Sequence, residues 1–323
     1  MCDSLIKKCV MNLVRILKNI VKTWKLYKYY DSKSQRAKNE EQWIIYMADG
    51  KMHHGGLSDR LCGLVSTYCY CLEHHKIFKV YFKSPYELET FLLPNKCNWR
   101  VDASDISYNV ADSIPVYIPH CKDVLRQIAQ ADKKLNLKCR QIHVYTNMRY
   151  FKENFSLLFS NLFRTSFPLQ DAIDFNRGKL PYKYVSITFR FQQLLGDFSE
   201  GNFPTIKSEE SKKKLINECL ACIDKVKGLN PGIEKILVTS DSSTFLNEVK
   251  KKDYVYVIPG DVVHLDFLKE KVDMRIHMKS FVDLFLIANA SKIFLANLPP
   301  LYKSSFPKTA SYLYGVEYVE IDN

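Results

Sequence analysis

The apolar residues of the chain fall into short runs of strand length that alternate with longer stretches of helical period. The strand-length runs lie at residues 43–47, 77–82, 141–145, 184–189, 236–240, 255–258 and 293–296. The stretches with apolar residues every three or four positions lie at residues 57–72, 122–132, 150–163, 209–227 and 281–290. Strands that alternate with helices predict an α/β fold built on parallel sheets.

Residues 168–183, where Gly178 and Pro181 stand, show neither pattern. A chain of 323 residues is long enough for two domains of ordinary size. We therefore interpret this stretch as the connection between two Rossmann-like domains. The predicted divisions are a basic amphipathic helix with a polar linker at residues 1–41, a first domain at residues 42–170 and a second at residues 171–323.

The N-terminal segment carries an apolar stripe between basic residues. The stripe recurs at steps of three and four positions and comprises Ile6, Cys9, Val10, Leu13, Leu17, Ile20, Val21 and Trp24. Charges interrupt every apolar run well before the ~18 residues of a transmembrane helix, and they also argue against a signal peptide. The pattern predicts that residues 1–30 lie on an anionic membrane surface. The alternative is a helix that packs on its own domain or on a partner subunit.

The net charge of the chain is +12, and its distribution limits what the protein binds. Residues 1–40 contain ten Lys or Arg and three acidic residues, a net charge of +7. The rest of the chain is only mildly basic, so no nucleic-acid groove is indicated. Ten cysteines are scattered through apolar stretches without the spacing of zinc ligands. They are predicted to be reduced core residues of a cytosolic protein.

A glycine turn follows the first predicted strand and opens the first long helix. Its residues run His54-Gly55-Gly56-Leu57-Ser58-Asp59-Arg60. The two glycines allow the backbone to approach a ligand closely, and the N–H groups at the start of a helix suit a phosphate or sugar oxygen. Asp59 and Arg60 at the mouth of the turn favour a ligand site over a tight strand-to-helix turn with no further function.

A second group of polar residues follows the strands of the second domain. Arg190 ends the apolar strand at residues 184–189 directly, and Gly196-Asp197 lies just downstream. Open α/β sheets bind their ligands at the carboxyl ends of the strands. A cation in this position therefore indicates an anionic ligand.

Three motifs occur in a fixed order over roughly residues 42–315: Gly-Gly-Leu-x-Asp-Arg-Leu at residues 55–61, Phe189-Arg190 with Gly-Asp-Phe at 196–198, and Ser-Ser-Phe at 304–306. The chain thereby resembles the fucosyltransferase-like glycosyltransferases, a superfamily with α-1,2, α-1,6 and protein-O-fucosyl enzymes. It looks most like their bacterial surface-polysaccharide branch. The resemblance implies the GT-B fold, two Rossmann-like doubly wound domains facing across a cleft, here with an N-terminal amphipathic helix. It also implies GDP-fucose as donor substrate, with no cofactor and no metal.

The resemblance also assigns roles to single residues. Arg190 matches the arginine that grips the donor diphosphate, and its planar fork suits that task. Asp59 matches a residue that faces the donor sugar. Asp283 matches a carboxylate that reads guanine in some relatives, although a simple charge at a helix N-terminus is the alternative. The full set expected at the donor is His54, Gly55, Gly56, Arg60, Thr188, Asp283, Ser304, Ser305 and Phe306.

Two departures from the family pattern stand out. Thr188 occupies the place where many relatives have a histidine, so that donor contact is lost or reduced to a hydroxyl. The sequence spacing between Asp283 and Ser304 is longer than in the family pattern, because residues 297–302 are inserted. Both departures affect the identification of the nucleotide base and the sugar more than they affect the identification of the reaction class.

The implied reaction is a metal-independent, inverting transfer of fucose to a glycan or lipid-linked glycan acceptor in surface polysaccharide synthesis. The predicted catalytic residues are Arg190, Asp59 and Asp197. Arg190 stabilises the leaving GDP, and Asp59 or Asp197 is the general base, with His54 as a third candidate. The enzyme would be cytoplasmic and peripherally bound to the inner face of the membrane. The alternative is a non-catalytic binding or scaffold protein of GT-B shape.

Overall fold

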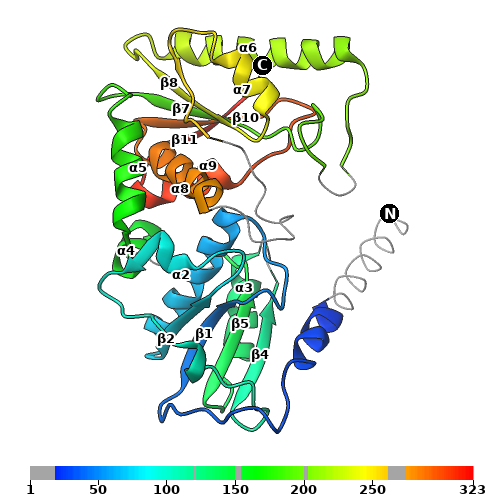
Figure 1. Ribbon diagram of the computed structural model, residues 1–323, viewed down its shortest axis with the longest axis vertical. Helices are drawn as coiled ribbons and strands as arrows, with labels where there is room; N and C mark the ends of the chain where they lie inside the picture. Colours follow the sequence, from blue (N-terminus) through cyan, green and yellow to red (C-terminus); the bar gives the residue numbers. More distant parts are fainter. Residues whose placement is uncertain are drawn as a thin grey trace. The chain divides into compact units, whose positions relative to one another are not determined.

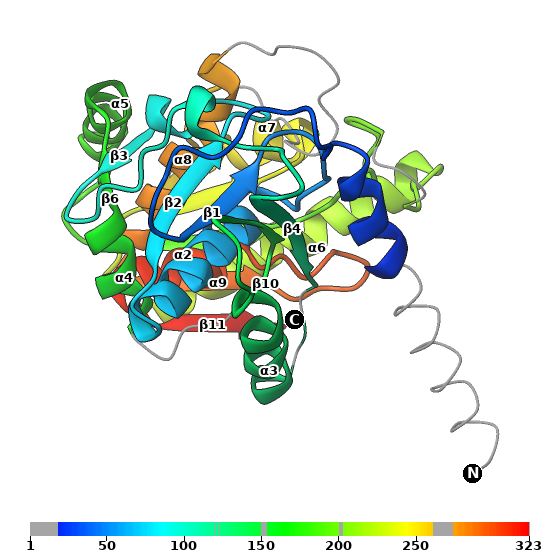
Figure 2. The same ribbon diagram turned by 90° about the horizontal axis from the view of Figure 1, so that it is seen from below.

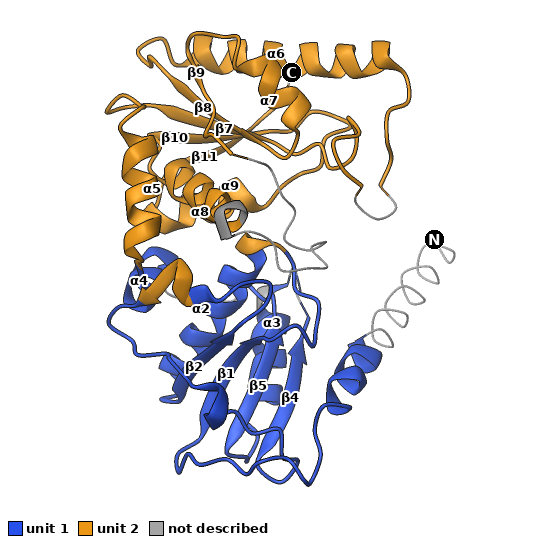
Figure 3. Ribbon diagram, viewed as in Figure 1, with its two compact units in different colours: residues 1–55, 59–88, 94–164 blue, residues 56–58, 89–93, 165–323 orange. Residues whose placement is uncertain are grey.

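The computed structural model describes residues 19–119, 121, 123–149, 154–199, 203–260 and 274–322. The chain divides into two compact units, each of which contains a parallel β-sheet (Figure 3). Unit 1 comprises residues 1–55, 59–88 and 94–164. Unit 2 comprises residues 56–58, 89–93 and 165–323.

The sheet of unit 1 has the strand order β2-β1-β5-β4, and all neighbouring strands are parallel. Its strands are β1 (Trp43–Ala48), β2 (Ile77–Phe82), β4 (Ser113–Ile118) and β5 (Gln141–Thr146). Helix α2 (Leu57–Glu73) connects β1 to β2, and α3 (Val124–Leu135) connects β4 to β5. Both connections run in the same direction along the sheet. Right-handed crossovers therefore place both helices on one face, as Figure 2 shows.

The opposite face of this sheet is covered by the chain that precedes β1. Residues 19–27 form a helix whose Leu26 is completely buried against Ile45, Met47 and Tyr145. Just beyond this helix, the Tyr30 hydroxyl lies 2.6 Å from Nδ1 of His143 in β5. The last turn of the helix thus packs on its own unit, as the alternative interpretation of the N-terminal segment predicted.

The first turns of the same helix present apolar side chains to solvent. Ile20 is 58% exposed, Val21 50% and Trp24 76%. The predicted membrane contact of residues 1–30 stays a prediction, and its first 18 residues lie outside the described part of the chain. No helix within the described residues is long and apolar enough to span a bilayer.

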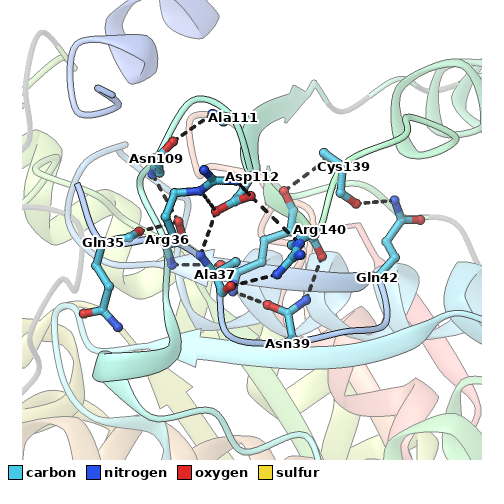
Figure 4. Close-up of polar contacts among 12 residues, drawn as sticks. Gln35, Arg36, Ala37, Asn39, Gln42, Asn109, Ala111, Asp112, Cys139 and Arg140 are labelled. Atoms are coloured by element: carbon cyan, nitrogen blue, oxygen red, sulfur yellow. Dashed lines mark hydrogen bonds and ion pairs between the residues drawn. The ribbon is translucent and has the colours of Figure 1, made fainter. Parts of the chain in front are cut away.

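Residues 31–42, expected to be a polar linker, form a strap that is fixed along unit 1 (Figure 4). Arg36 donates from Nε to Oδ2 of Asp112 at 2.6 Å and from Nη2 to Oδ1 at 2.9 Å. The N–H of Ala37 donates to the same carboxylate at 2.8 Å. Further along the strap, Nε2 of Gln141 donates to Oδ1 of Asn39 at 2.7 Å. The strap joins the N-terminal helix to β1 through specific hydrogen bonds.

The strap makes the stability of unit 1 dependent on pH through Asp112. The hydrogen bond from Arg36 is the main cause that lowers the pKa of the Asp112 carboxyl to about 2. A carboxyl whose pKa is lower in the folded than in the unfolded protein stabilises the fold above ~4 and loses this contribution as the pH falls towards ~2. We expect Asp112→Asn to unfold at a lower urea concentration than the wild type at pH 7.

The same comparison at pH 3 supplies the control for this prediction. The difference in unfolding free energy between the wild type and Asp112→Asn should shrink between pH 5 and pH 3. A difference that stays constant over this range would mean that the charge of Asp112 contributes nothing to the strap.

The sheet of unit 2 has the strand order β11-β10-β7-β8-β9, again with parallel neighbours (Figure 1). Its strands are β7 (Val185–Phe189), β8 (Ile236–Ser240), β9 (Val255–Tyr256), β10 (Lys292–Ala296) and β11 (Tyr318–Ile321). Its helices are α5 (Phe167–Arg177), α6 (Glu209–Leu229), α7 (Ser243–Val249), α8 (Met274–Ala288) and α9 (Phe306–Tyr314). Helices α6 and α7 cover one face of the sheet, and α8 and α9 cover the other.

The apolar residues of β7 explain how unit 2 is layered. Val185, Ile187 and Phe189 alternate along the strand and join a buried cluster with Cys219 and Ile223 of α6. Side chains two apart on a strand share a face, so this face of β7 is the core contact with α6. The chain connects β7 to β8 on one side and β10 to β11 on the other. The topological switch point of the sheet therefore lies between β7 and β10.

Three elements differ from the sequence expectations or were not anticipated. Residues 168–183 are not simply a connection, because α5 occupies most of the stretch. Ser166 caps this helix by accepting from the N–H of Leu169 at 3.4 Å, and Pro168 lies in the first turn, where a missing N–H costs nothing. The edge strand β4 and the two-stranded sheet of β3 (Leu92–Pro94) and β6 (Phe163–Thr165) were not predicted.

The remaining elements are short. Helix α4 covers Phe155–Leu162, and two 3-10 turns cover Leu88–Thr90 and Ala103–Asp105. The eight cysteines within the described residues form no disulfide with one another, and five of them are buried in the core, whereas Cys97, Cys121 and Cys139 are only partly buried.

Candidate active site

Arg190 lies at the carboxyl end of β7, next to the switch point of the unit 2 sheet. Its side chain is 21% exposed, and Nη1 lies 2.8 Å from Oδ2 of Asp241, the residue that follows β8. β7 and β8 are hydrogen-bonded neighbours, so residues at their carboxyl ends are brought side by side. The guanidinium is thereby held at the edge of the sheet where open α/β folds bind ligands.

Asp241 also fixes the backbone that follows Arg190. Its Oδ1 accepts from the N–H of Phe191 and its Oδ2 from the N–H of Gln192, both at 2.7 Å. Gln192 adopts a φ of 54°, an uncommon conformation for a residue with a side chain. Burial raises the pKa of the Asp241 carboxyl, while Arg190 and the two N–H groups act in the opposite direction. These three donors therefore stabilise the charged carboxylate, and the carboxylate in turn fixes their positions.

Asp197 lies in the loop after Arg190 and connects this loop to α7, the helix that follows β8. Its Oδ1 accepts from Ser243 Oγ, Thr244 Oγ1 and Thr244 N at 2.6–2.9 Å, and its Oδ2 accepts from Ser242 Oγ at 2.5 Å. Burial alone would raise the pKa of Asp197, but the hydrogen bonds outweigh it and lower the pKa. The carboxylate caps the N-terminus of α7, and its predicted role as general base stays a prediction.

The Ser-Ser-Phe segment lies at the other side of the switch point, between β10 and α9. Ser304 Oγ accepts from the N–H of Phe306 at 3.2 Å, and Ser305 occupies the N-cap position of α9. The backbone N–H of Tyr302 donates to the carbonyl of Arg190 at 2.9 Å. The segment that leads into Ser304, Ser305 and Phe306 is thus held beside Arg190, and these three residues stand at the start of α9, where a helix N-terminus favours anions.

Thr188 sits within β7 and is 6% exposed. Its Oγ1 lies 2.8 Å from Oγ1 of Thr239 in the neighbouring strand β8. The hydroxyl that replaces the family histidine therefore has a partner inside the sheet. Its predicted contact with the donor stays a prediction.

Asp283 does not start a helix, as the sequence interpretation had it, because α8 begins at Met274. Its carboxylate instead forms a two-pronged ion pair with Lys279, one turn earlier, with distances of 2.9 and 2.8 Å. Burial raises the pKa of the Asp283 carboxyl, and Lys279 opposes this. The alternative interpretation of Asp283 as an N-terminal helix charge is wrong. Guanine recognition by this residue stays a prediction.

In the glycine turn, the Asp59 side chain folds back on the backbone of Gly55. A side chain at Gly55 would put its Cβ only 2.4 Å from Oδ2 of Asp59, so any other residue there would displace the Asp59 carboxylate. Arg149, three residues beyond β5, donates from Nη2 to Oδ1 of Asp59 at 3.0 Å. The Asp59 side chain stays 37% exposed. A side chain at Gly56 would meet no described atom within 4 Å, which leaves that backbone approachable.

Arg60 and His54 support the turn from inside. Arg60 is 6% exposed and donates from Nε to the carbonyl of Gly55 at 2.8 Å and from Nη1 to that of Ser84 at 3.0 Å. His54 is 2% exposed, and its Nδ1 lies 3.2 Å from the side-chain amide of Asn147. Burial, assisted by Arg60, lowers the pKa of His54 to about 4, so the ring is neutral at pH 7. These contacts of both residues are made with the turn itself and with Ser84 and Asn147 of unit 1, and the predicted donor contacts of both stay predictions.

Sequence reasoning gave no site role to three residues that the structure places at these two sites. Asp241, Lys279 and Arg149 each pair with a predicted site residue. Asp241 carried a usable signal, since it directly follows a buried strand. Lys279 pairs with Asp283 one turn later on the same helix, whereas the pairing of Arg149 with Asp59 is set by tertiary geometry. Among the described residues, no group of three or more His, Cys, Asp or Glu side chains is arranged to hold a metal ion.

Comparison with solved structures identifies the architecture. The chain is similar to the fucosyltransferase NodZ from Bradyrhizobium with a TM-score of 0.56 and 16% identity, over 88% of this chain and 96% of that one. It is similar to NodZ alpha-1,6-fucosyltransferase soaked with GDP-fucose at a TM-score of 0.55 and 15% identity, over 85% and 93% of the two chains. An Arabidopsis thaliana FUT1 variant in complex with GDP gives a TM-score of 0.53 and 11% identity, over 92% and 73%.

No family model matches the chain, and no curated protein matches it in sequence. At identities this low, the structural likeness concerns the fold. The fold is α/β of the GT-B type, with two Rossmann-like units built on parallel sheets of four and five strands. This confirms the fold class that the sequence predicted.

The contacts of Asp241 with Arg190 and the backbone after it can be tested by measuring the free energy of unfolding. Asp241→Ala leaves a largely buried guanidinium and two backbone N–H groups without this acceptor, so we expect a loss of about 3 kcal/mol in unfolding free energy. Asp197→Ala removes the acceptor of four hydrogen bonds at the partly exposed N-terminus of α7, where water can replace it, and should cost about 1 kcal/mol. Urea denaturation of both variants measures the difference. Equal, small losses would show that Asp241 does not carry the loop.

Proposed function

We propose that the protein is a glycosyltransferase that moves a sugar from a nucleotide diphosphate donor, most simply fucose from GDP-fucose, to a glycan acceptor. The observation that carries this proposal is the hydrogen bond from the Tyr302 N–H to the carbonyl of Arg190, which holds the segment leading into Ser304–Phe306 beside the Arg190 loop at the switch point of unit 2. A held cation beside a helix N-terminus is the arrangement that suits a diphosphate. The solved structures of similar fold include one soaked with GDP-fucose and one in complex with GDP, which supports the same ligand class.

The chemistry follows from where charge develops. Breaking the bond between sugar and diphosphate leaves positive charge on the sugar and negative charge on the departing nucleotide. Arg190, the hydroxyls of Ser304 and Ser305 and the first N–H groups of α9 would stabilise the departing diphosphate. Because Asp241 and the Tyr302 N–H already hold Arg190, little reorganisation is needed as the charge appears.

Asp59 is the better candidate for the general base. Its carboxylate is 37% exposed, whereas Asp197 accepts four hydrogen bonds that lower its pKa and weaken it as a base. His54 is almost fully buried, so a substrate hydroxyl would have to displace packed side chains to reach it. Inversion at the anomeric carbon without a metal ion is part of the proposal.

The second candidate function is a non-catalytic protein that binds a nucleotide sugar on the same fold. Thr188 favours it mildly, because its hydroxyl is bonded to Thr239 within the sheet. The two functions differ in turnover and not in binding.

Arg190→Ala is the variant that tests the enzyme. Loss of one donor to a developing negative charge costs ~3 kcal/mol, so the release of GDP from GDP-fucose in the presence of acceptor should slow about a hundredfold or more. Arg190→Lys should restore little, because an ammonium group cannot reproduce the planar fork. Arg164→Ala, at an exposed position, is the matched control and should retain full activity.

Binding measurements on the same variants separate the candidates. Calorimetry with GDP should show weaker binding to Arg190→Ala than to the wild type, with melting curves that establish folding. Folded Arg190→Ala with normal turnover would refute the site. Tight GDP-fucose binding by the wild type without turnover on any acceptor would favour the binding protein.

The N-terminal helix is part of the proposal as a membrane contact. Its apolar stripe at Ile20, Val21 and Trp24 is exposed and lies among Lys22, Lys25 and other basic residues. Such a helix combines apolar burial with attraction to anionic lipid. A lipid-linked glycan acceptor would lie at that surface, which places the enzyme at the inner face of the membrane.

Removal of residues 1–18 together with Trp24→Ala should abolish sedimentation with vesicles that contain phosphatidylserine. The deletion ends before Leu26 and Tyr30, because these buried residues belong to the core of unit 1. Tyr182→Ala, which removes an aromatic residue that is 87% exposed on unit 2, is the control and should sediment like the wild type. Equal sedimentation of all three proteins would refute the membrane contact.

A further inference from the structure

Two large aromatic side chains stand partly exposed near Arg190 on unit 2. Tyr302 is 51% exposed and Phe203 is 40% exposed. Their ring centroids are 6.5 Å apart, and the rings are inclined by 65° in an edge-to-face contact. They come from the loop before α6 and from the segment between β10 and α9, so the fold brings them together from distant parts of the sequence.

The segment that carries Tyr302 is the insertion noted in the sequence, residues 297–302. Asn297 continues the strand ladder by donating its N–H to the carbonyl of Ile321 at 2.9 Å. Leu298 is buried in the core of unit 2, and a turn closes with the N–H of Leu301 on its carbonyl at 2.7 Å. The N–H of Tyr302 then bonds to the carbonyl of Arg190. The insertion is therefore anchored at both ends and delivers one aromatic ring to the Arg190 loop.

Phe203 is attached to the same loop from the other side. Its carbonyl accepts a hydrogen bond from Nε2 of Gln193, a residue that is only 8% exposed. Three residues later, the N–H of Ile206 donates to the carbonyl of Leu194 at 2.9 Å. Both rings are thus held by backbone contacts within a few residues of Arg190, and neither position depends on the ring being buried.

A ligand that offers an apolar face beside polar groups suits this surface. Binding sites combine aromatic faces with a few placed polar groups, and a sugar ring has a C–H face next to its hydroxyls. We propose that Phe203 and Tyr302 form the stacking surface for a saccharide ring of the acceptor, an inference that rests on the proposed glycosyltransferase function. We define this pair as the aromatic rim.

The exposure of the rim favours the acceptor over the donor as its occupant. Arg190, expected on the donor diphosphate, is about four-fifths covered, whereas about half of Tyr302 remains open to solvent. An acceptor glycan extends away from the reacting hydroxyl into solvent, so one of its rings can lie on an open surface. The hydrogen bond from Tyr302 to the Arg190 carbonyl makes the rim continuous with the proposed donor site.

The test compares glycan binding and nucleotide binding on full-length protein. The probes are GDP, measured by calorimetry, and an array of immobilised mono- to tetrasaccharides read with GDP at saturation. Phe203→Ala and Tyr302→Ala should each weaken saccharide binding about tenfold, with GDP affinity changed less than about twofold. Tyr302→Phe keeps the ring and should bind like the wild type, as should the exposed control Tyr182→Ala.

Leucine variants at both positions guard against simple misfolding, because they keep apolar bulk while removing the flat ring. They should melt like the wild type and bind saccharides as weakly as the alanine variants. Unchanged saccharide binding in the folded variants, or no saccharide bound by the GDP-saturated wild type, would overturn the rim. Equal loss of GDP binding would overturn it as well, by assigning the rings to the nucleotide. Failure of the wild type to bind GDP would instead refute the proposed donor.

Discussion

The candidate site of unit 2 depends on the carboxylate of Asp241. A buried carboxylate is stable only with enough donors around it, and here the donors are the Arg190 guanidinium and the N–H groups of Phe191 and Gln192. The same three contacts fix the side chain of Arg190 and the left-handed turn after it. The Arg190 carbonyl is fixed separately by Tyr302. The cation is therefore oriented before any ligand arrives, which is what stabilisation of a developing charge requires.

In the glycine turn, the charged side chains have different surroundings. Arg60 and the neutral His54 are turned inward: Arg60 holds the backbone at Gly55, and His54 contacts the side chain of Asn147. Asp59 lies against Gly55 and keeps an exposed carboxylate. Two neighbouring charged residues in one motif thus have opposite surroundings. The spacing of residues along the chain does not distinguish them.

Local sequence patterns predicted the parts of the fold that are determined by interactions between residues close together in the sequence. β1, the glycine turn and α2 were predicted because period and turn chemistry agree there, and the Arg190 strand because apolar residues alternate along it. β4 was missed because Pro115 interrupts its pattern. Proline lacks an N–H donor but is tolerated here, because β4 is an edge strand and one of its sides has no neighbouring strand to pair with. α5 was missed because Pro168 looks like a break, although the Ser166 cap places it in the first turn. The pairing of Arg149 with Asp59 depends on tertiary geometry, which no local pattern contains, whereas that of Lys279 with Asp283 is an i,i+4 contact within α8 and was missed because the helix was expected to begin only at residue 281.

The N-terminal helix is attached to unit 1 over its last turn and through the strap, with Leu26 in the core and Arg36 on Asp112. An attachment of this kind fixes the orientation of the helix relative to the sheet of unit 1 as well as its distance from the sheet. Whatever surface holds the exposed side of the helix also sets the angle at which the sheet of unit 1 stands to that surface, and the height of its strand ends above it. A flexible leash of the same length would limit only the distance.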